Sequence, residues 1–149
     1  MANEPGAPAE RTLLGVSICV FRDDEVLMIE RGKAPGIGLW APVGGGIEPG
    51  EAAEAAALRE VAEETAVACE LVGRVGTREI VPENPPPGSP TRIRLEVFAA
   101  RWTAGEPIAG SDARAARFVP IGDVGLLATM PGVVPWIEAA RRLFDGAEA

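Results

Sequence analysis

An acidic helix that follows a run of glycines is the feature that most restricts how this chain of 149 residues folds. Residues 44–46 are all glycine and are expected to form a turn, and the segment from Glu51 to about residue 65 is expected to form a helix. Within it, Glu60, Glu63 and Glu64 are spaced i, i+3 and i+4, which places them within an arc of roughly 100° on one helix face. Like charges at this spacing destabilise a helix by a few tenths of a kcal/mol. A divalent cation would remove that cost, and carboxylate oxygens suit Mg²⁺ or Mn²⁺ better than zinc.

The composition excludes several kinds of chemistry. The chain contains no histidine, so Ser-His-Asp and Cys-His catalysis and His-based zinc sites are excluded. The net charge of −8 leaves no broad basic surface, and a nucleic-acid polymer is therefore not an expected partner. No apolar run approaches the roughly 18 residues that a membrane span requires. The chain is accordingly expected to act in the cytoplasm, with no membrane partner.

A single domain of the α+β class is expected. Residues 1–10 are rich in Pro, Ala and Glu and are predicted to be a disordered tail, which leaves 11–149 as one domain. Alternation and β-branched content predict strands over residues 13–21, 25–31, 40–43, 69–81, 92–102 and 115–119. A short helix over 120–127 and an amphipathic helix over 132–144 complete the pattern.

The acidic helix is expected to have two distinct faces. Its apolar stripe is predicted to point away from the carboxylates and to comprise Ala55, Leu58, Val61, Ala62 and Thr65. The carboxylate face carries only small residues in its first half, namely Ala53, Ala56 and Ala57. Their size would let a backbone segment or a ligand approach the helix closely.

The spacing around this helix resembles the signature of the Nudix hydrolases, Gly-x5-Glu-x7-Arg-Glu-apolar-x-Glu-Glu-x-Gly-apolar. The matching positions are Gly45, Glu51, Arg59, Glu60, Val61, Glu63, Glu64 and Val67. Ala66 stands where the family has a glycine that ends the helix, and a left-handed alanine there costs on the order of 1 kcal/mol. The resemblance implies an α/β/α sandwich around a mixed β-sheet.

The resemblance also implies roles for the acidic residues. The adjacent Glu63 and Glu64 would be metal ligands, and Glu60 would be either a ligand or the base that takes a proton from the attacking water. Gly44 would offer its backbone carbonyl to the metal. Glu51 would be an auxiliary ligand that acts through a water molecule. Mg²⁺ would be the cofactor, with Mn²⁺ as a substitute.

Basic residues near the signature are further candidates. Arg59 lies beside the acidic cluster and would orient a glutamate by ion pairing. Arg31 and Lys33 lie in a loop before the signature and would be able to contact substrate phosphates. Exposed, solubilising charge is an equally good interpretation of Arg31 and Lys33, and the sequence does not decide between the two.

Substrate contacts are also assigned to Trp40, Gly45 and Gly46. Trp40 fits a core position better than a surface that stacks on a base, so both interpretations stay open. A loop carboxylate near the metal is a feature of some family members. Glu106 and Asp112 are the two candidates for it here, because both follow the strand over 92–102.

The favoured function is Mg²⁺-dependent hydrolysis of a pyrophosphate bond in a nucleoside diphosphate linked to another moiety. Residues 31–40 and 113–121 resemble members that act on ADP-ribose, and nucleoside triphosphates are the next candidates. One alternative is a nucleotide-binding regulatory module without catalysis, against which the complete acidic set argues. A second alternative is an acidic structural domain with no ligand. Family members often form homodimers, and nothing in the sequence decides that point.

Overall fold

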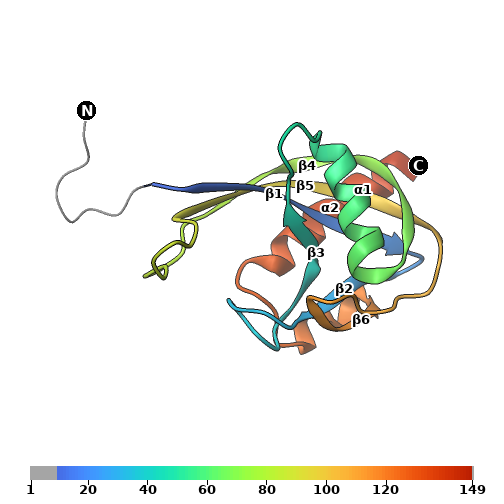
Figure 1. Cartoon of the computed structure of the whole chain (residues 1–149). Coiled ribbons are helices and arrows are strands. Elements are labelled where there is room, and N and C mark those ends of the chain that lie inside the picture. Colours follow the sequence, from blue (N-terminus) through green and yellow to red (C-terminus); the bar gives the residue numbers. More distant parts are fainter. Residues whose placement is uncertain (1–9, 149) are drawn as a thin grey trace.

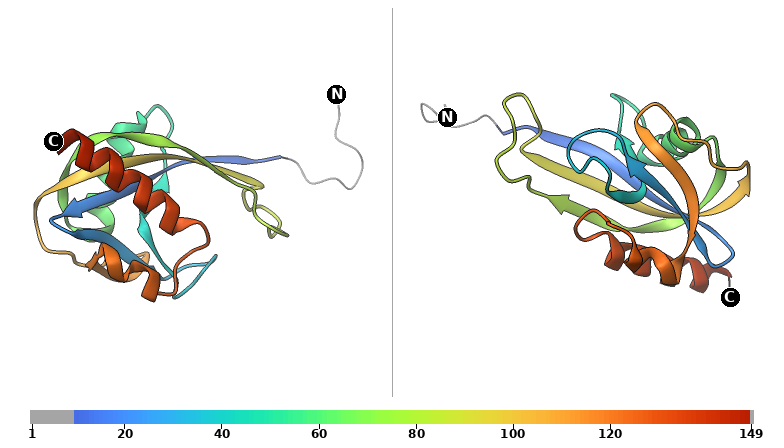
Figure 2. Two further views of the ribbon diagram at one scale, coloured as in Figure 1. Left: turned by 180° about the vertical axis from the view of Figure 1, so that it is seen from behind. Right: turned by 90° about the horizontal axis from the view of Figure 1, so that it is seen from below.

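A six-stranded mixed sheet between two helices forms the frame of the protein (Figures 1 and 2). The computed structural model describes residues 10–148. In chain order the elements are β1 (Thr12–Arg22), β2 (Glu25–Arg31), β3 (Trp40–Gly46), α1 (Ala53–Thr65), β4 (Ala68–Ile80), β5 (Arg92–Ala104), β6 (Ala113–Pro120), the 3₁₀ helix η1 (Ile121–Leu126) and α2 (Val133–Glu148). The expected α+β class and α/β/α sandwich are confirmed. The predicted disorder of residues 1–10 lies outside the described residues, apart from Glu10.

The strand order is β4-β5-β1-β3-β2-β6, with β1 at the centre. β1 and β5 run parallel, whereas the other neighbouring strands are antiparallel. In β1, Val16, Ile18 and Val20 belong to the core on the α1 side, and Cys19 and Phe21 belong to the core on the α2 side. Both faces of β1 are apolar because a helix covers each face of the sheet.

Helix α2 packs through the stripe expected from its sequence. Val133, Ile137, Ala140 and Phe144 are all buried, and they recur at the three- and four-residue spacing of one helix face. The ring of Phe144 lies 5.1 Å, between centroids, from that of Phe21 in β1. This face therefore joins α2 to the central strand.

The predicted faces of α1 are partly wrong. Ala55, Leu58 and Ala62 are exposed, and the buried residues are Ala56, Ala57, Glu60, Val61, Glu64 and Thr65. Two small alanines let α1 lie close to the sheet, and the next turns of the same face then bring two carboxylates inward. The acidic face of α1 thus points toward the sheet, where charge is costly unless it is compensated.

The glycines at 44–46 continue β3 and do not form the expected turn. Gly44, Gly45 and Gly46 pair with Ser17, Val16 and Gly15 of β1. A Cβ atom at Gly44 would lie 2.8 Å from the carbonyl oxygen of Val16. The absence of side chains therefore lets β1 and β3 approach closely, and the chain turns toward α1 only after residue 46.

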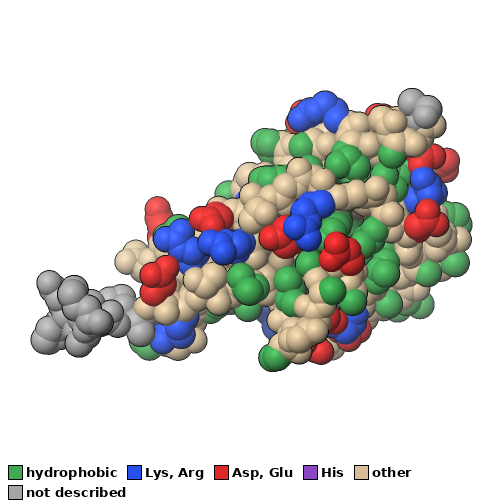
Figure 3. All heavy atoms as spheres, turned by 90° about the horizontal axis from the view of Figure 1, so that it is seen from above, with side chains coloured by type: hydrophobic (Ala, Val, Ile, Leu, Met, Phe, Trp, Pro, Cys, Tyr) green, Lys and Arg blue, Asp and Glu red, His purple; other side chains and the backbone are tan. Residues whose placement is uncertain are grey.

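One end of the sheet projects beyond the helices, where β1 begins and β4 and β5 are joined by a proline-rich segment (Figure 1). Glu79 in β4 pairs there with Arg92 at 3.2 Å and with Arg94 at 2.9 Å in β5. On the face drawn in Figure 3, basic and acidic side chains are interleaved over this end. Within residues 10–148, no helix has the length and apolarity needed to cross a membrane.

Candidate active site

The guanidinium group of Arg59 lies in the middle of the acidic cluster. Its Nε and Nη2 atoms each donate to one carboxylate oxygen of Glu51 at 2.8 Å. Its Nη1 atom donates to Glu60 at 3.0 Å and to Glu63 at 3.2 Å, and Nη2 also donates to the carbonyl of Gly46 at 3.0 Å. One side chain thus connects α1, the end of β3 and the segment between them.

Glu51 is held as a carboxylate by two donors. The Arg59 guanidinium and the backbone N–H of Glu48, at 3.0 Å, lower the pKa of Glu51 to about 2. The hydrogen bonds that Arg59 donates to Glu51 and to Glu60 raise the pKa of Arg59 above its ordinary value. The bidentate ion pair between Arg59 and Glu51 fixes the geometry of the two side chains as well as their charge. Arg59 therefore orients Glu51 and Glu60, while its part in catalysis stays a prediction.

The carboxylate of Glu60 packs directly against the backbone of β3 at Gly45. A Cβ atom at Gly45 would lie 2.5 Å from Glu60 Oε2, so only glycine leaves room for this carboxylate. Burial raises the pKa of Glu60, and the ion pair with Arg59 opposes that shift. Gly45 contributes space for a metal-ligand candidate, and Gly44, one residue earlier, lies in the same strand.

Glu64 differs from the other carboxylates of the cluster in its hydrogen bonding. It is only 9% exposed, and within the described part of the chain its Oε2 is a buried oxygen with no hydrogen-bond partner. Burial raises its pKa, and the neighbouring charges of Asp112, Glu60 and Glu63 raise it further. An unpaired buried carboxylate oxygen costs free energy. A cation at this point would supply the missing interaction.

Lys33 and Asp112 meet beside Glu64, although they come from different loops. Lys33 Nζ lies 2.6 Å from Asp112 Oδ1, and the Asp112 hydrogen bond raises the pKa of Lys33, with a smaller effect from Glu64. Glu106, the other loop candidate, is bound elsewhere, because its carboxylate pairs with Arg22 at 2.9 Å. The structure therefore brings Asp112, and not Glu106, to the acidic cluster.

Arg31 and Trp40 are not brought into contact with the carboxylates. Arg31 Nε donates to the carbonyl of Pro35 at 2.7 Å and so supports its own loop. Trp40 packs against the core on the α2 side, and the guanidinium of Arg117 lies 4.7 Å from its ring centroid. These contacts agree with the core interpretation of Trp40. Substrate binding by Arg31 and Trp40 stays a prediction.

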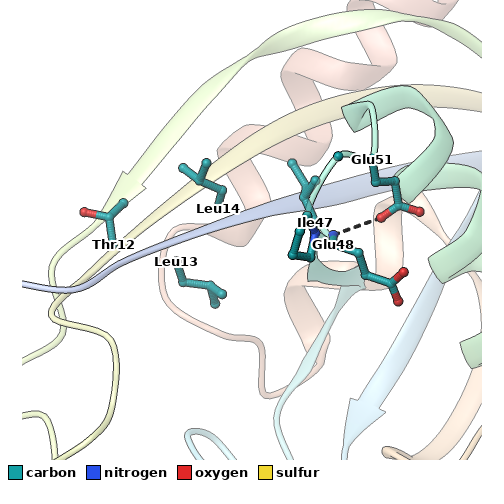
Figure 4. A pocket seen from close by; sticks show the side chains of 8 residues that line it. Thr12, Leu13, Leu14, Ile47, Glu48 and Glu51 are labelled. Atoms are coloured by element: carbon teal, nitrogen blue, oxygen red, sulfur yellow. Dashed lines mark hydrogen bonds between the residues drawn. The ribbon is translucent and has the colours of Figure 1, made fainter.

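A shallow cavity of about 410 Å³ lies next to Glu51, between the start of β1 and the segment that joins β3 to α1 (Figure 4). Its lining consists of Thr12, Leu13, Leu14, Ile47, Glu48, Pro49, Gly50 and Glu51. Sequence reasoning missed this cavity, because the first residues of β1 are far from the signature in the chain. Apolar side chains thus lie next to the acidic cluster.

The donor set fits a hard divalent cation. No three acidic side chains among residues 10–148 converge on a single point, because Arg59 lies among them and like charges repel. A closed cage is not needed, since Mg²⁺ usually takes one or two carboxylates together with phosphate oxygens and water. Glu60 and Glu64 face inward, and burial raises the pKa of both. Glu64 Oε2 has no hydrogen-bond partner in the described part of the chain, and Glu63 is adjacent and exposed.

Comparison with known families identifies the domain. A family model described as the NUDIX domain matches residues 11–139, which include the whole sheet, α1 and the first part of α2. The chain belongs to the Nudix family, and the resemblance inferred from the signature is confirmed.

Two curated relatives are identical to this chain at about a third of the aligned positions. The ADP-ribose pyrophosphatase of Methanocaldococcus jannaschii is 34% identical over 109 residues, which is 73% of this chain and 62% of that protein. The human 8-oxo-dGDP phosphatase NUDT18 is 35% identical over 108 residues, which is 70% of this chain and 31% of that protein. The alignments thus span less than two thirds of either relative.

Solved structures support the same fold at lower identity. The MutT NUDIX hydrolase from Burkholderia pseudomallei matches with a TM-score of 0.72 at 23% identity, covering 87% of this chain and 98% of that one. The NUDIX domain of Shewanella oneidensis NrtR, a complex with ADP ribose, matches with a TM-score of 0.71 at 22% identity, covering 95% and 94%. At these identities the likeness establishes the fold alone.

Proposed function

We propose that this protein is a Mg²⁺-dependent Nudix hydrolase that cleaves the pyrophosphate bond of a nucleoside diphosphate linked to another moiety. The observation that carries the proposal is the buried Oε2 of Glu64, beside Glu60 on the signature helix, which has no hydrogen-bond partner among residues 10–148. The family match supports hydrolysis as the reaction. Mn²⁺ as a substitute is supported by a structural neighbour, the bifunctional NMN adenylyltransferase/ADP ribose pyrophosphatase from Francisella tularensis, which was solved with AMP and a manganese ion. It matches with a TM-score of 0.65 at 22% identity, and the match covers 95% of this chain and 43% of that one.

ADP-ribose is the favoured substrate. The archaeal relative is an ADP-ribose pyrophosphatase, and the NrtR domain forms a complex with ADP ribose. The cavity beside Glu51 adds apolar surface from Leu13, Leu14 and Ile47 that would accommodate the nucleoside part of such a molecule.

The residues divide the work of hydrolysis. Glu63 and Glu64 would hold the metal, with Glu60 beside them as a further ligand or as the base, and Mg²⁺, when bound, would neutralise charge on the phosphate oxygens. Arg59 keeps Glu51 and Glu60 in place through the ion pairs described above. A water oxygen attacks phosphorus, the bond from phosphorus to the bridging oxygen breaks, and the bridging oxygen leaves with one phosphate.

The proton released from that water needs an acceptor. Glu60 is our candidate for this base, because burial raises its pKa and so makes the carboxylate a better proton acceptor. Lys33, an exposed cation beside Glu64, is the candidate for contacting the substrate phosphates. Gly44 would add its backbone carbonyl, and Glu51 would act through water.

Nucleoside triphosphates are the second candidate class of substrate. The putative 8-oxo-dGTP diphosphatase of Bacillus subtilis is 37% identical over 59 residues, which is 40% of this chain and 38% of that protein. The human relative, a phosphatase of 8-oxo-dGDP, also acts on a phosphorylated nucleoside. Both observations keep nucleotides without a second linked moiety in the panel of substrates.

Assay of the purified protein against ADP-ribose, nucleoside triphosphates and 8-oxo-dGTP with Mg²⁺ tests the proposal. We expect ADP-ribose to yield AMP and ribose 5-phosphate, EDTA to abolish the reaction, and Mg²⁺ or Mn²⁺ to restore it. Tight nucleotide binding without turnover would instead support a regulatory module. The absence of both binding and turnover would support a structural domain.

Light scattering of the same sample tests the homodimer that the family resemblance implies. Activity confined to the soluble fraction of its cells would support a cytoplasmic location.

A further inference from the structure

The loop that joins β5 to β6, residues 105–112, lies across the C-terminal end of α1. The backbone N–H of Gly110 donates to the carbonyl of Glu64 at 2.8 Å, and the N–H of Ile108 donates to the carbonyl of Thr65 at 2.9 Å. The last carbonyls of a helix have no partner within the helix itself. This 105–112 loop supplies two of the missing donors, at the residues that end the carboxylate cluster.

Gly110 is in contact with the backbone of the helix. A Cβ atom at Gly110 would lie 2.6 Å from the carbonyl oxygen of Glu63 and 2.9 Å from Cα of Glu64. Both are backbone atoms, so a larger residue would displace the loop or the helix end. Gly105 is similarly close, because its Cβ would lie 2.7 Å from the carbonyl oxygen of Ala66. Two glycines of the loop thus allow its contact with α1.

The same loop also holds Lys33. Beyond the ion pair between Lys33 and Asp112 at 2.6 Å, the N–H of Gly32 donates to the backbone carbonyl of Asp112 at 3.1 Å. Lys33 and Asp112 are 66% and 48% exposed, and an exposed ion pair contributes little to stability. The backbone contacts of the 105–112 loop therefore fix the position of Asp112, and Asp112 in turn orients Lys33.

We propose that the 105–112 loop sets the position of the Glu64 carboxylate relative to the Lys33 ammonium group. Gly110 and Asp112 are then positioning residues: Gly110 acts through the backbone of Glu64, and Asp112 acts through Lys33. The inference rests on the proposed function, because the two positioned groups are the metal ligand and the phosphate contact of that reaction.

The substitution Gly110→Ala tests the contact with the helix. We expect a Mn²⁺ dissociation constant at least about fivefold higher, measured by electron paramagnetic resonance on the folded protein, and a kcat at least about tenfold lower. Gly122→Ala is the matched control, since a Cβ there meets no atom within 4 Å, and it should match the wild type. Equal Mn²⁺ affinity and kcat in Gly110→Ala and the wild type would overturn the role of Gly110.

A double-mutant cycle tests Asp112 without disturbing the core. Asp112→Asn and Lys33→Gln are each expected to raise the KM for ADP-ribose at least about fivefold, and the double variant should be no worse than Lys33→Gln alone within about twofold. Effects that multiply, or weaker Mn²⁺ binding in Asp112→Asn on the Lys33→Gln background, would overturn the proposal. In those cases Asp112 would act on the metal directly.

Mn²⁺ binding separates the two hypotheses. If the wild type hydrolyses no nucleotide but Gly110→Ala still weakens Mn²⁺ binding, the loop inference survives and the proposed function fails. If the wild type is active and Gly110→Ala matches it in Mn²⁺ affinity and kcat, the proposed function survives and the inference fails. A wild type with neither activity nor Mn²⁺ affinity would contradict both. Should Gly110→Ala not fold, the Asp112 cycle decides.

Discussion

Gly45 in β3 provides the space that the carboxylate of Glu60 in α1 occupies. A methyl group at Gly45 would lie 2.5 Å from Glu60 Oε2, well inside van der Waals contact. Glu60 is only 8% exposed, and its carboxylate accepts a hydrogen bond from Arg59 at 3.0 Å. The first glycine of the signature thus allows the Glu60 carboxylate to lie against β3, because it has no side chain there.

Gly45→Ala should therefore displace the Glu60 carboxylate without unfolding the protein, because the end of a flexible side chain can move. We expect kcat to fall by at least about tenfold and the Mg²⁺ concentration for half-maximal activity to rise. Gly125→Ala is the control, since a Cβ there meets no atom within 4 Å. Equal activity of the two variants would show that Glu60 does not need this space.

Glu63→Gln and Glu64→Gln should each lower kcat by at least about 100-fold, the loss expected when a contact that stabilises transition-state charge is removed. Glu54→Gln is the control within the same helix, because Glu54 is 60% exposed and lies 3.8 Å from Arg74. Steady-state kinetics with saturating Mg²⁺ measure the effect. Rates like the wild type in either test variant would refute the assignment of that residue as a ligand.

The metal-free protein should lose stability as the pH rises. Burial raises the pKa values of Glu60 and Glu64 above the ordinary 4.5, so the folded state binds more protons than the unfolded state just above that pH. Their stabilising protonation is fully present below 4.5 and is lost as the pH rises through the raised values. Urea unfolding in EDTA between pH 4.5 and neutrality measures the decline.

Glu51 should have the opposite effect at lower pH. Its pKa is lowered to about 2, so its contribution is present above 4.5 and is lost as the pH falls toward 2. In Glu64→Gln the decline above 4.5 should flatten. Added Mg²⁺ should stabilise the wild type more at neutral pH than near 4.5, because the ion binds ionised carboxylates. A flat pH profile in EDTA would contradict both assignments.

Much of the fold could be predicted from local pattern. The stripe of Val133, Ile137, Ala140 and Phe144 predicted α2 because its spacing matches one helix face, and the strands followed from apolar alternation. The prediction of the apolar stripe of α1 was partly wrong, because alanine occurs on both the buried and the exposed face of this helix and so does not indicate which face is buried. Ala56 and Ala57 are small enough for this face of α1 to pack against the sheet, and Glu60 and Glu64 lie on the same buried face.

The sequence predicted which acidic residues would cluster but not how they are arranged, and their function stays a prediction. Spacing identified Glu60, Glu63 and Glu64, since a helix places them by geometry alone. The contact between Lys33 and Asp112 joins residues 79 positions apart, and no local pattern encodes it. The capping of α1 by Gly110 likewise depends on where the chain returns after β5, so it became visible only in three dimensions.

Ala66→Gly should stabilise the protein and leave turnover within a few-fold of the wild type. Ala66 has φ 59° and ψ 15°, so the left-handed conformation that a family glycine would adopt is present at this alanine. Relief of that strain is worth about 1 kcal/mol, which corresponds to a melting temperature higher by about 2–4 °C. Ala62→Gly, at an exposed position inside α1, should lower stability by about 0.5–1 kcal/mol. Calorimetry on both variants measures the shifts. A gain in turnover of orders of magnitude in Ala66→Gly would instead show that the alanine weakens the active site, because the carboxylates upstream would then depend on how the helix ends.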